Sequence, residues 1–150
     1  MKNFKLKIDL VPSTAWYSNL RSKISRSEWD KIRKQSYIDA NHKCAICSAD
    51  GKLNCHEIWE YDDEKHIQLL KGFIALCDNC HMIKHIGFAG IQASKGLLDM
   101  DKLVEHFMKV NGCDRRSFEE HHKKCFEVWR ERSKNKWKTN LSKWTSLVKK

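Results

Sequence analysis

The chain has 150 residues, a formal net charge of +10, seven cysteines and one proline. This length suits a single domain with a modest core, and no run approaches the roughly 20 apolar residues that a membrane span needs, so we expect no membrane partner. Residues 1–10 alternate lysine with apolar side chains and lack the apolar region of a secretory signal. We therefore expect a reducing, cytoplasmic setting, in which disulfides do not persist.

The basic residues concentrate at the two ends of the chain. Residues 1–34 contain nine lysines and arginines against three acidic residues, and residues 130–150 contain eight against Glu131 alone. Basic segments bind phosphates by releasing counterions, so this distribution favours DNA, with RNA or a protein partner as alternatives. A solvated helix face would carry the same charge. The candidate nucleic-acid contacts are Lys134, Lys136, Lys138 and Lys143.

The N-terminal third predicts a strand followed by helices. Apolar and charged side chains alternate over residues 5–11, which is typical of a short strand. Pro12 ends it, and a helix is expected next, with one face formed by Trp16, Leu20 and Ile24. Ser27 is followed by an acidic first turn, which predicts a second helix to about Ala40.

The remainder of the chain predicts a few short strands and then helices. Alternating apolar positions indicate a strand over residues 53–59, an acidic loop or helix start follows at 61–64, and two apolar runs at 67–70 and 73–76 lead towards the later cysteines. A helix is expected from about Asn79 to Ile86, ended or bent by Gly87 and Gly90. Further helices are expected over residues 97–110, 115–137 and 142–148.

Two C-x-x-C motifs dominate the chemistry of the sequence. Each motif places two thiolates in one tight turn, and two such turns complete a tetrahedral zinc site with Zn–S distances near 2.3 Å. Two disulfides are the alternative, which the odd number of cysteines and the expected reducing setting disfavour. The predicted zinc ligands are Cys44, Cys47, Cys77 and Cys80. Buried small side chains are expected at Cys55, Cys113 and Cys125.

The segments CAIC (44–47), LNCHEIW (53–59) and FIALCDNCHMIKH (73–85) resemble the HNH endonucleases, which are ββα-metal nucleases with a structural zinc ribbon. The resemblance covers about residues 44–88. It implies an α+β fold whose ββα-metal core carries the four-cysteine zinc site. The expected single domain, 1–150, then consists of a basic N-terminal part (1–43), this core (44–88) and a helical C-terminal part with a basic tail (97–150).

The resemblance also implies a second, catalytic centre. A divalent ion, Mg²⁺ or another, would be held by His56 and His81. His85 lies one helical turn after His81 on the same side and is a further candidate ligand, with a phosphate contact or a surface position as the alternative. Alignment of the strand places Glu57 at the position of the general base. A shift by one residue makes Cys55 the ligand and His56 the base. A cysteine thiolate is an unusual ligand for Mg²⁺. The catalytic residues implied by the resemblance are thus His56, Glu57 and His81.

Two family positions carry unexpected residues. Counting back from Cys77 puts Gly72 where the family has a loop asparagine, and Glu57 stands where it has a histidine. A carboxylate serves as a base when its pKa is tuned, so a DNA endonuclease with a weakened site is the first hypothesis. The second is an inactive HNH-like zinc module that binds nucleic acid or a protein.

Overall fold

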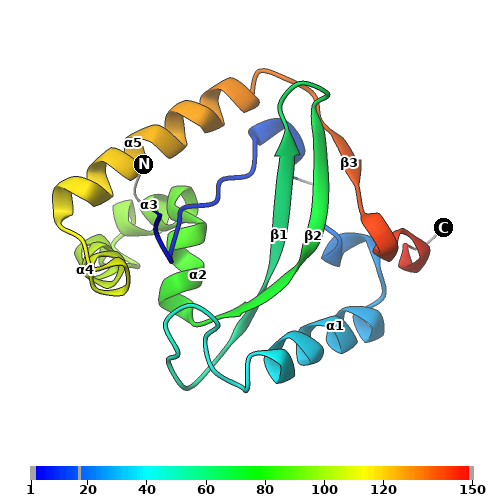
Figure 1. The fold of residues 1–150 in the computed structure, drawn as a ribbon, viewed down its shortest axis with the longest axis horizontal. Coiled ribbons are helices and arrows are strands. Elements are labelled where there is room, and N and C mark those ends of the chain that lie inside the picture. The colour runs from blue at the N-terminus through cyan, green and yellow to red at the C-terminus, as the bar shows by residue number, and fades with distance from the viewer. Residues whose placement is uncertain (1–2, 17, 149–150) are drawn as a thin grey trace.

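The computed structural model describes residues 3–16 and 18–148, which form a mixed α+β fold around a three-stranded sheet (Figure 1). None of the helices in this described part of the chain combines the length and the apolar character that a membrane crossing requires. The elements in chain order are η1 (Ser13–Ala15), η2 (Arg21–Lys23), α1 (Arg26–Asp39), β1 (Asn54–Asp62), β2 (Ile67–Leu76), α2 (Asp78–Lys84), α3 (Ile86–Ser94), α4 (Met100–Asn111), α5 (Arg115–Arg132), β3 (Lys138–Asn140) and η3 (Ser142–Leu147).

The sheet has the order β1-β2-β3. β1 and β2 form an antiparallel hairpin that pairs Asn54 with Leu76 and has an irregular register between Ile58 and Trp59. The two apolar runs expected before the second cysteine pair are therefore one strand. β3 runs parallel to β2 and was not predicted, because three residues of mixed character carry no periodic signal. The Lys138 amide donates to the His66 carbonyl at 2.9 Å and begins this pairing.

Two hydrophobic cores flank the sheet. The larger core packs the cysteine-bearing turns against α2, α3, α4 and α5, with Phe107 of α4 fully buried. The smaller core joins α1 and η3 to the sheet around Trp29, Leu70 and Leu141. Figure 1 shows α2 to α5 gathered beside β1 and α1 on the other side of the hairpin. The hairpin thus lies between the two cores and can present side chains to both.

The N-terminal segment is extended but forms no strand, so the prediction for residues 5–11 was wrong. The alternation is real, because Leu6 and Ile8 are buried. Their backbone groups bind side chains instead of a neighbouring strand: Leu6 exchanges two hydrogen bonds with the Asn111 amide, and the Ile8 N–H donates to His121 Nε2. The helix expected after Pro12 is likewise replaced by η1 and η2, with Leu20 and Ile24 buried and Trp16 exposed.

The later helices are present with altered ends. α1 is present where a helix was expected, but it begins at Arg26, and Ser25 instead of Ser27 is the N-cap that accepts from the Glu28 amide. α2 ends at Lys84, and Gly87 and Gly90 lie inside α3 instead of ending the preceding helix. α5 stops at Arg132, short of the expected Trp137, whose indole N–H donates to the Arg132 carbonyl. The last predicted helix is the 3-10 turn η3.

Candidate metal centres

The four predicted cysteines form one cluster at the start of α2. Their Sγ atoms all lie within 4.8 Å of one another, and the Sγ atoms of Cys47 and Cys77 are 3.6 Å apart. A tetrahedral zinc–thiolate site with 2.3 Å bonds separates its sulfurs by about 3.8 Å. The four residues are buried or half-buried within the larger core. The cluster is therefore shaped to hold a metal ion such as zinc.

Both C-x-x-C turns have the same local structure. In each, the amide of the second cysteine donates to the sulfur of the first, at 3.5 Å for Cys47 to Cys44 and 3.4 Å for Cys80 to Cys77. The Ala45 amide donates to the Ala75 carbonyl at 2.9 Å and joins the first turn to the end of β2. The spacing of each motif and the end of the hairpin thus bring the two sulfur pairs together.

The surroundings favour the thiolate at Cys44 and oppose it at Cys77 and Cys80. Burial would raise the pKa of Cys44, but the backbone amides of Cys47, Cys77 and Ile46 lower it to about 7. Burial raises the pKa of Cys77 to about 11, and burial together with the neighbouring thiolates raises that of Cys80. A bound divalent ion removes this repulsion, because the thiolate is the form that binds metal.

His106 adds a contact to this cluster that the sequence did not predict. Its Nε2 atom lies 3.2 Å from the Sγ of Cys80, so this contact joins α4, which carries His106, to α2, which carries Cys80. An imidazole N–H in this position donates to a thiolate and delocalises its charge, as groups around metal ligands commonly do. His106 is itself half-buried.

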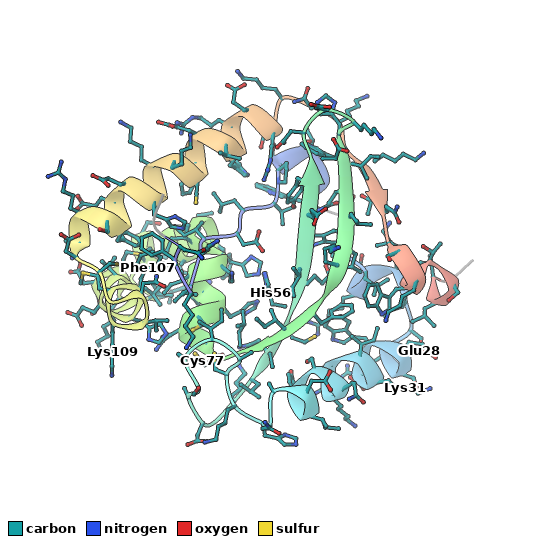
Figure 2. The ribbon with its side chains drawn as sticks, viewed as in Figure 1. Glu28, Lys31, His56, Cys77, Phe107 and Lys109 are labelled. Atoms are coloured by element: carbon teal, nitrogen blue, oxygen red, sulfur yellow. The ribbon has the colours of Figure 1, made fainter. Side chains whose placement is uncertain are left out.

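Three histidines form a second cluster, and one of them, His81, directly follows Cys80 on α2. His56 comes from β1, His81 from α2, and His85 from the junction of α2 with α3. One ring nitrogen of each lies within 4.8 Å of the others. His56 is only 6% exposed, and in Figure 2 it lies between β1 and α2. The structure thus brings together the three histidines for which a catalytic ion was expected.

The environment keeps two of these imidazoles neutral. Burial lowers the pKa of His81 to about 4, and the neighbouring His56 adds to the shift. Burial likewise lowers the pKa of His85 to about 4, with further contributions from His56 and His81. A neutral imidazole has the free lone pair that a metal ligand requires, so His81 and His85 are in the ligand form at neutral pH.

A carboxylate that the sequence did not indicate lies beside the histidines. Asp9 Oδ2 is 3.2 Å from His56 Nε2, and the Asp9 amide donates to the Lys84 carbonyl at 3.2 Å. The N-terminal segment thus reaches the end of α2 and presents one acidic side chain to the cluster. No local motif marks Asp9, because the contact joins residues 47 positions apart.

Glu57 binds the start of η2 and lines the same cavity as the histidines. Its Oε2 accepts from the amides of Leu20 and Arg21, at 2.8 and 3.3 Å, and so holds the start of η2 against β1. Burial is the main cause that raises the pKa of Glu57. Gly72, the expected loop position, lies inside β2 opposite Ile58. The family's loop position therefore falls in a strand of this protein.

A cavity of about 320 Å³ opens beside the histidine cluster. Its lining combines the histidines of the cluster and the carboxylates of Asp9 and Glu57 with aromatic rings. The lining includes Asp9, Trp16, Arg21, His56, Glu57 and His85. The cavity therefore joins Glu57 and the histidines to one space that a small substrate group can enter.

The four candidate lysines of the C-terminal part are all exposed. Lys134 forms an ion pair with Glu131 at 2.8 Å, and the Lys143 ammonium lies 5.1 Å from the Trp144 ring centroid. The nearby indoles are occupied: Trp137 packs edge-on against Tyr61, and Trp144 against Phe73. These contacts fix the basic residues along the sheet and leave their ammonium groups accessible to solvent.

Comparison of the chain with models of known protein families, with curated proteins and with solved structures finds no match. The class of protein that the coordinates define is thus a small α+β domain with a four-cysteine cluster able to hold a metal such as zinc. Any more particular function rests on the geometry of the chain's own residues.

Proposed function

We propose that this protein is a metal-dependent endonuclease of the HNH type, which hydrolyses phosphodiester bonds in DNA. The observation that carries the proposal is the convergence of His56, His81 and His85 on one point next to the cysteine cluster. The order of a two-stranded hairpin followed by a helix agrees with a ββα-metal core. The basic ends of the chain suit a polyanionic substrate.

The histidine cluster fits a divalent transition-metal ion better than Mg²⁺. Three imidazoles suit zinc, nickel, copper or iron, whereas Mg²⁺ prefers oxygen ligands in octahedral geometry. His56, His81 and His85 would hold the ion. When bound, such an ion supplies Lewis-acid stabilisation of the charge that develops on a phosphodiester during hydrolysis.

The other side chains position the site and move a proton. Asp9 Oδ2 fixes the ring of His56 from behind, because a carboxylate that accepts the N–H of a metal-binding histidine sets its tautomer and orientation. Glu57 is the proposed general base for the attacking water. Burial raises its pKa, which makes the carboxylate a stronger base.

A plasmid-nicking assay tests the proposal. Zinc-loaded protein is incubated with supercoiled plasmid and Mg²⁺, Mn²⁺, Ni²⁺ or Co²⁺, beside His56→Ala and His81→Ala. We expect nicking by the wild type with a transition ion and its loss in both variants. His42→Ala is the matched control, because this exposed histidine lies outside both clusters. Equal nicking by wild type and His81→Ala, or none with any ion, would exclude the nuclease.

The second candidate function is a non-catalytic module that binds nucleic acid on the same scaffold. The observation in its favour is that Glu57 and Gly72 replace the histidine and asparagine of the HNH family. Glu57 on this view only anchors η2, as its bonds to Leu20 and Arg21 already do. Persistent gel shifts with no nicking under any ion would favour this module.

Both candidates predict that the exposed lysines of the C-terminal part bind phosphates. Deleting residues 130–150 would also remove β3 and the buried Leu141, so neutral substitutions are the better test. We expect glutamine at Lys134, Lys136, Lys138 and Lys143 to weaken binding and to flatten the plot of log K against log[salt]. The slope should change by about 0.9 for each lost contact, as measured by fluorescence anisotropy from 50 to 300 mM salt, roughly the range where this dependence is steep.

An unchanged slope in that quadruple variant would mean that these lysines are solvated surface residues. Four substitutions on the opposite end of the molecule provide the control. Lys95, Lys109, Lys123 and Lys124 lie on or after α3, α4 and α5 and outside residues 130–150. Their neutralisation removes the same charge, so a specific role requires a smaller change in slope from this second set.

A further inference from the structure

We propose that the cavity beside the histidines binds one unpaired nucleotide, whose base stacks on the indole of Trp16, so that the substrate is single-stranded or locally melted nucleic acid. This inference rests on the proposed function, because it names the form of nucleic acid that reaches the same site. It uses the cavity and its aromatic rim, which the resemblance to a nuclease family does not supply.

The size of the cavity suits a single nucleotide. Its volume of about 320 Å³ is at the lower end of the roughly 300–1,000 Å³ of pockets that bind small molecules. It is lined by His56, His81 and His85 and also by Trp16 and Arg21. A nucleotide in this one space is therefore offered an indole for its base and the histidine cluster for its backbone.

Trp16 is held as a fixed platform at the rim. Its side chain is 56% exposed, which is unusual for so large an apolar ring. The indole N–H donates to the Val11 carbonyl at 2.9 Å. Because this hydrogen bond satisfies the polar group, the apolar face of the ring remains for stacking. The same turn is fastened to the end of α5, because the Ser13 amide donates to Ser133 Oγ and Thr14 Oγ1 donates to the Asn135 carbonyl.

Arg21 supplies a cation at the cavity, whose lining also includes the carboxylates of Asp9 and Glu57. Arg21 is exposed at the rim, and its guanidinium lies 5.4 Å from the Trp29 ring centroid, a contact that limits its motion. Glu57 fixes the Arg21 backbone through the amide. A second hollow, of about 520 Å³, shares His81 and includes Lys52 and Lys102 in its lining, together with Asp78 and Asp99. A strand that places a base on Trp16 can thus direct neighbouring phosphates to cations on either side of His81.

The requirement for an unpaired base follows from stacking. In a duplex each base is stacked on both faces and offers only its edges to a protein. An indole face inside a cavity reaches a base only after that base has left the stack, which is least costly in single strands and melted regions. Stacking on an aromatic side chain stabilises any of the four bases, so we expect little sequence preference at this position.

Binding of short oligonucleotides tests the inference without any cleavage. Fluorescein-labelled 12-mers, single-stranded or as a duplex of the same sequence, are titrated with zinc-loaded protein and no other added metal, and anisotropy is recorded. We expect the single strand to bind at least about ten-fold more tightly than the duplex. Trp16→Ala should weaken single-strand binding by about 5- to 150-fold, the range for loss of one stacked base, and Trp16→Phe should retain most of it.

The matched control is Phe88→Ala on α3. The side chain of Phe88 is 52% exposed, a fraction similar to the 56% of Trp16, and it lies outside the lining of the cavity. Its loss should therefore leave binding unchanged. Equal affinity for duplex and single strand, or equal effects of Trp16→Ala and Phe88→Ala, would overturn the inference. These outcomes leave the nuclease itself intact if plasmid is still nicked in a His81-dependent way. Trp16-dependent binding without any nicking would instead reject the nuclease and keep the nucleotide site.

Discussion

Cys77→Ser is expected to release the structural metal and to unfold the larger core of the protein. The variant should lose about one equivalent of zinc and its cooperative thermal transition. Cys77 has two roles in the fold, since its Sγ belongs to the four-cysteine cluster and also accepts the Cys80 amide at the start of α2. A serine hydroxyl is a poor replacement for a zinc-binding thiolate.

The size of this effect follows from where the cluster lies. Cys44, Cys77 and Cys80 belong to the larger hydrophobic core, together with residues of α2 and α4. Zinc binding to such sites is worth roughly 10–16 kcal/mol in small zinc-binding peptides, whereas the whole stability of a domain is typically about 5–15 kcal/mol. Loss of the ion therefore removes free energy comparable to the entire stability of the fold.

Zinc content by mass spectrometry of the metal and unfolding by circular dichroism measure the two parts of the effect. Cys125→Ser is the control, because Cys125 is half-buried in the same core and lies outside the cluster. It should keep its zinc and shift the melting temperature only modestly. A Cys77→Ser protein with an unchanged melting temperature would show that the cluster does not hold the fold together.

The parts of the fold that the sequence predicts are those set by short-range patterns. The two C-x-x-C turns need only their own spacing and the end of the β1–β2 hairpin to bring four sulfurs together. The alternation of β1 and the existence of α1, although not its cap, are equally local. His81 and His85 are one turn apart, so their joint position follows from a helix, although the helix ends between Lys84 and Ile86.

The features that the sequence does not predict depend on distant partners. Residues 5–11 have strand periodicity, yet their backbone is satisfied by the side chains of Asn111 and His121, which come from α4 and α5. β3 exists because residues after α5 return to β2. The partners of neighbouring strand residues also depend on tertiary structure. Successive strand residues point to opposite faces. Glu57 therefore binds the start of η2, whereas His56 contacts His81 of α2.

Asp9→Ala is expected to weaken metal binding at the histidine centre by roughly 10- to 100-fold, the usual effect of removing a group that orients a metal ligand. Asp9 Oδ2 lies 3.2 Å from His56 Nε2, and His56 is almost fully buried. The carboxylate therefore holds the proton on Nε2 and leaves Nδ1 as the nitrogen that can bind an ion. Asp9→Asn should lose less, because its amide oxygen still accepts this hydrogen bond.

Calorimetric titration of zinc-loaded protein with Ni²⁺ measures the affinity, and ¹⁵N chemical shifts of the His56 ring report its tautomer. Glu60→Ala is the matched control: Glu60 is an exposed acid on the same strand, paired with Lys71 at 3.9 Å. We expect it to leave both measurements unchanged. An Asp9→Ala protein with wild-type Ni²⁺ affinity and an unaltered His56 tautomer would mean that the N-terminal segment only packs against α2. A loss of affinity with the tautomer change would instead establish that a residue 47 positions before His56 belongs to the metal centre.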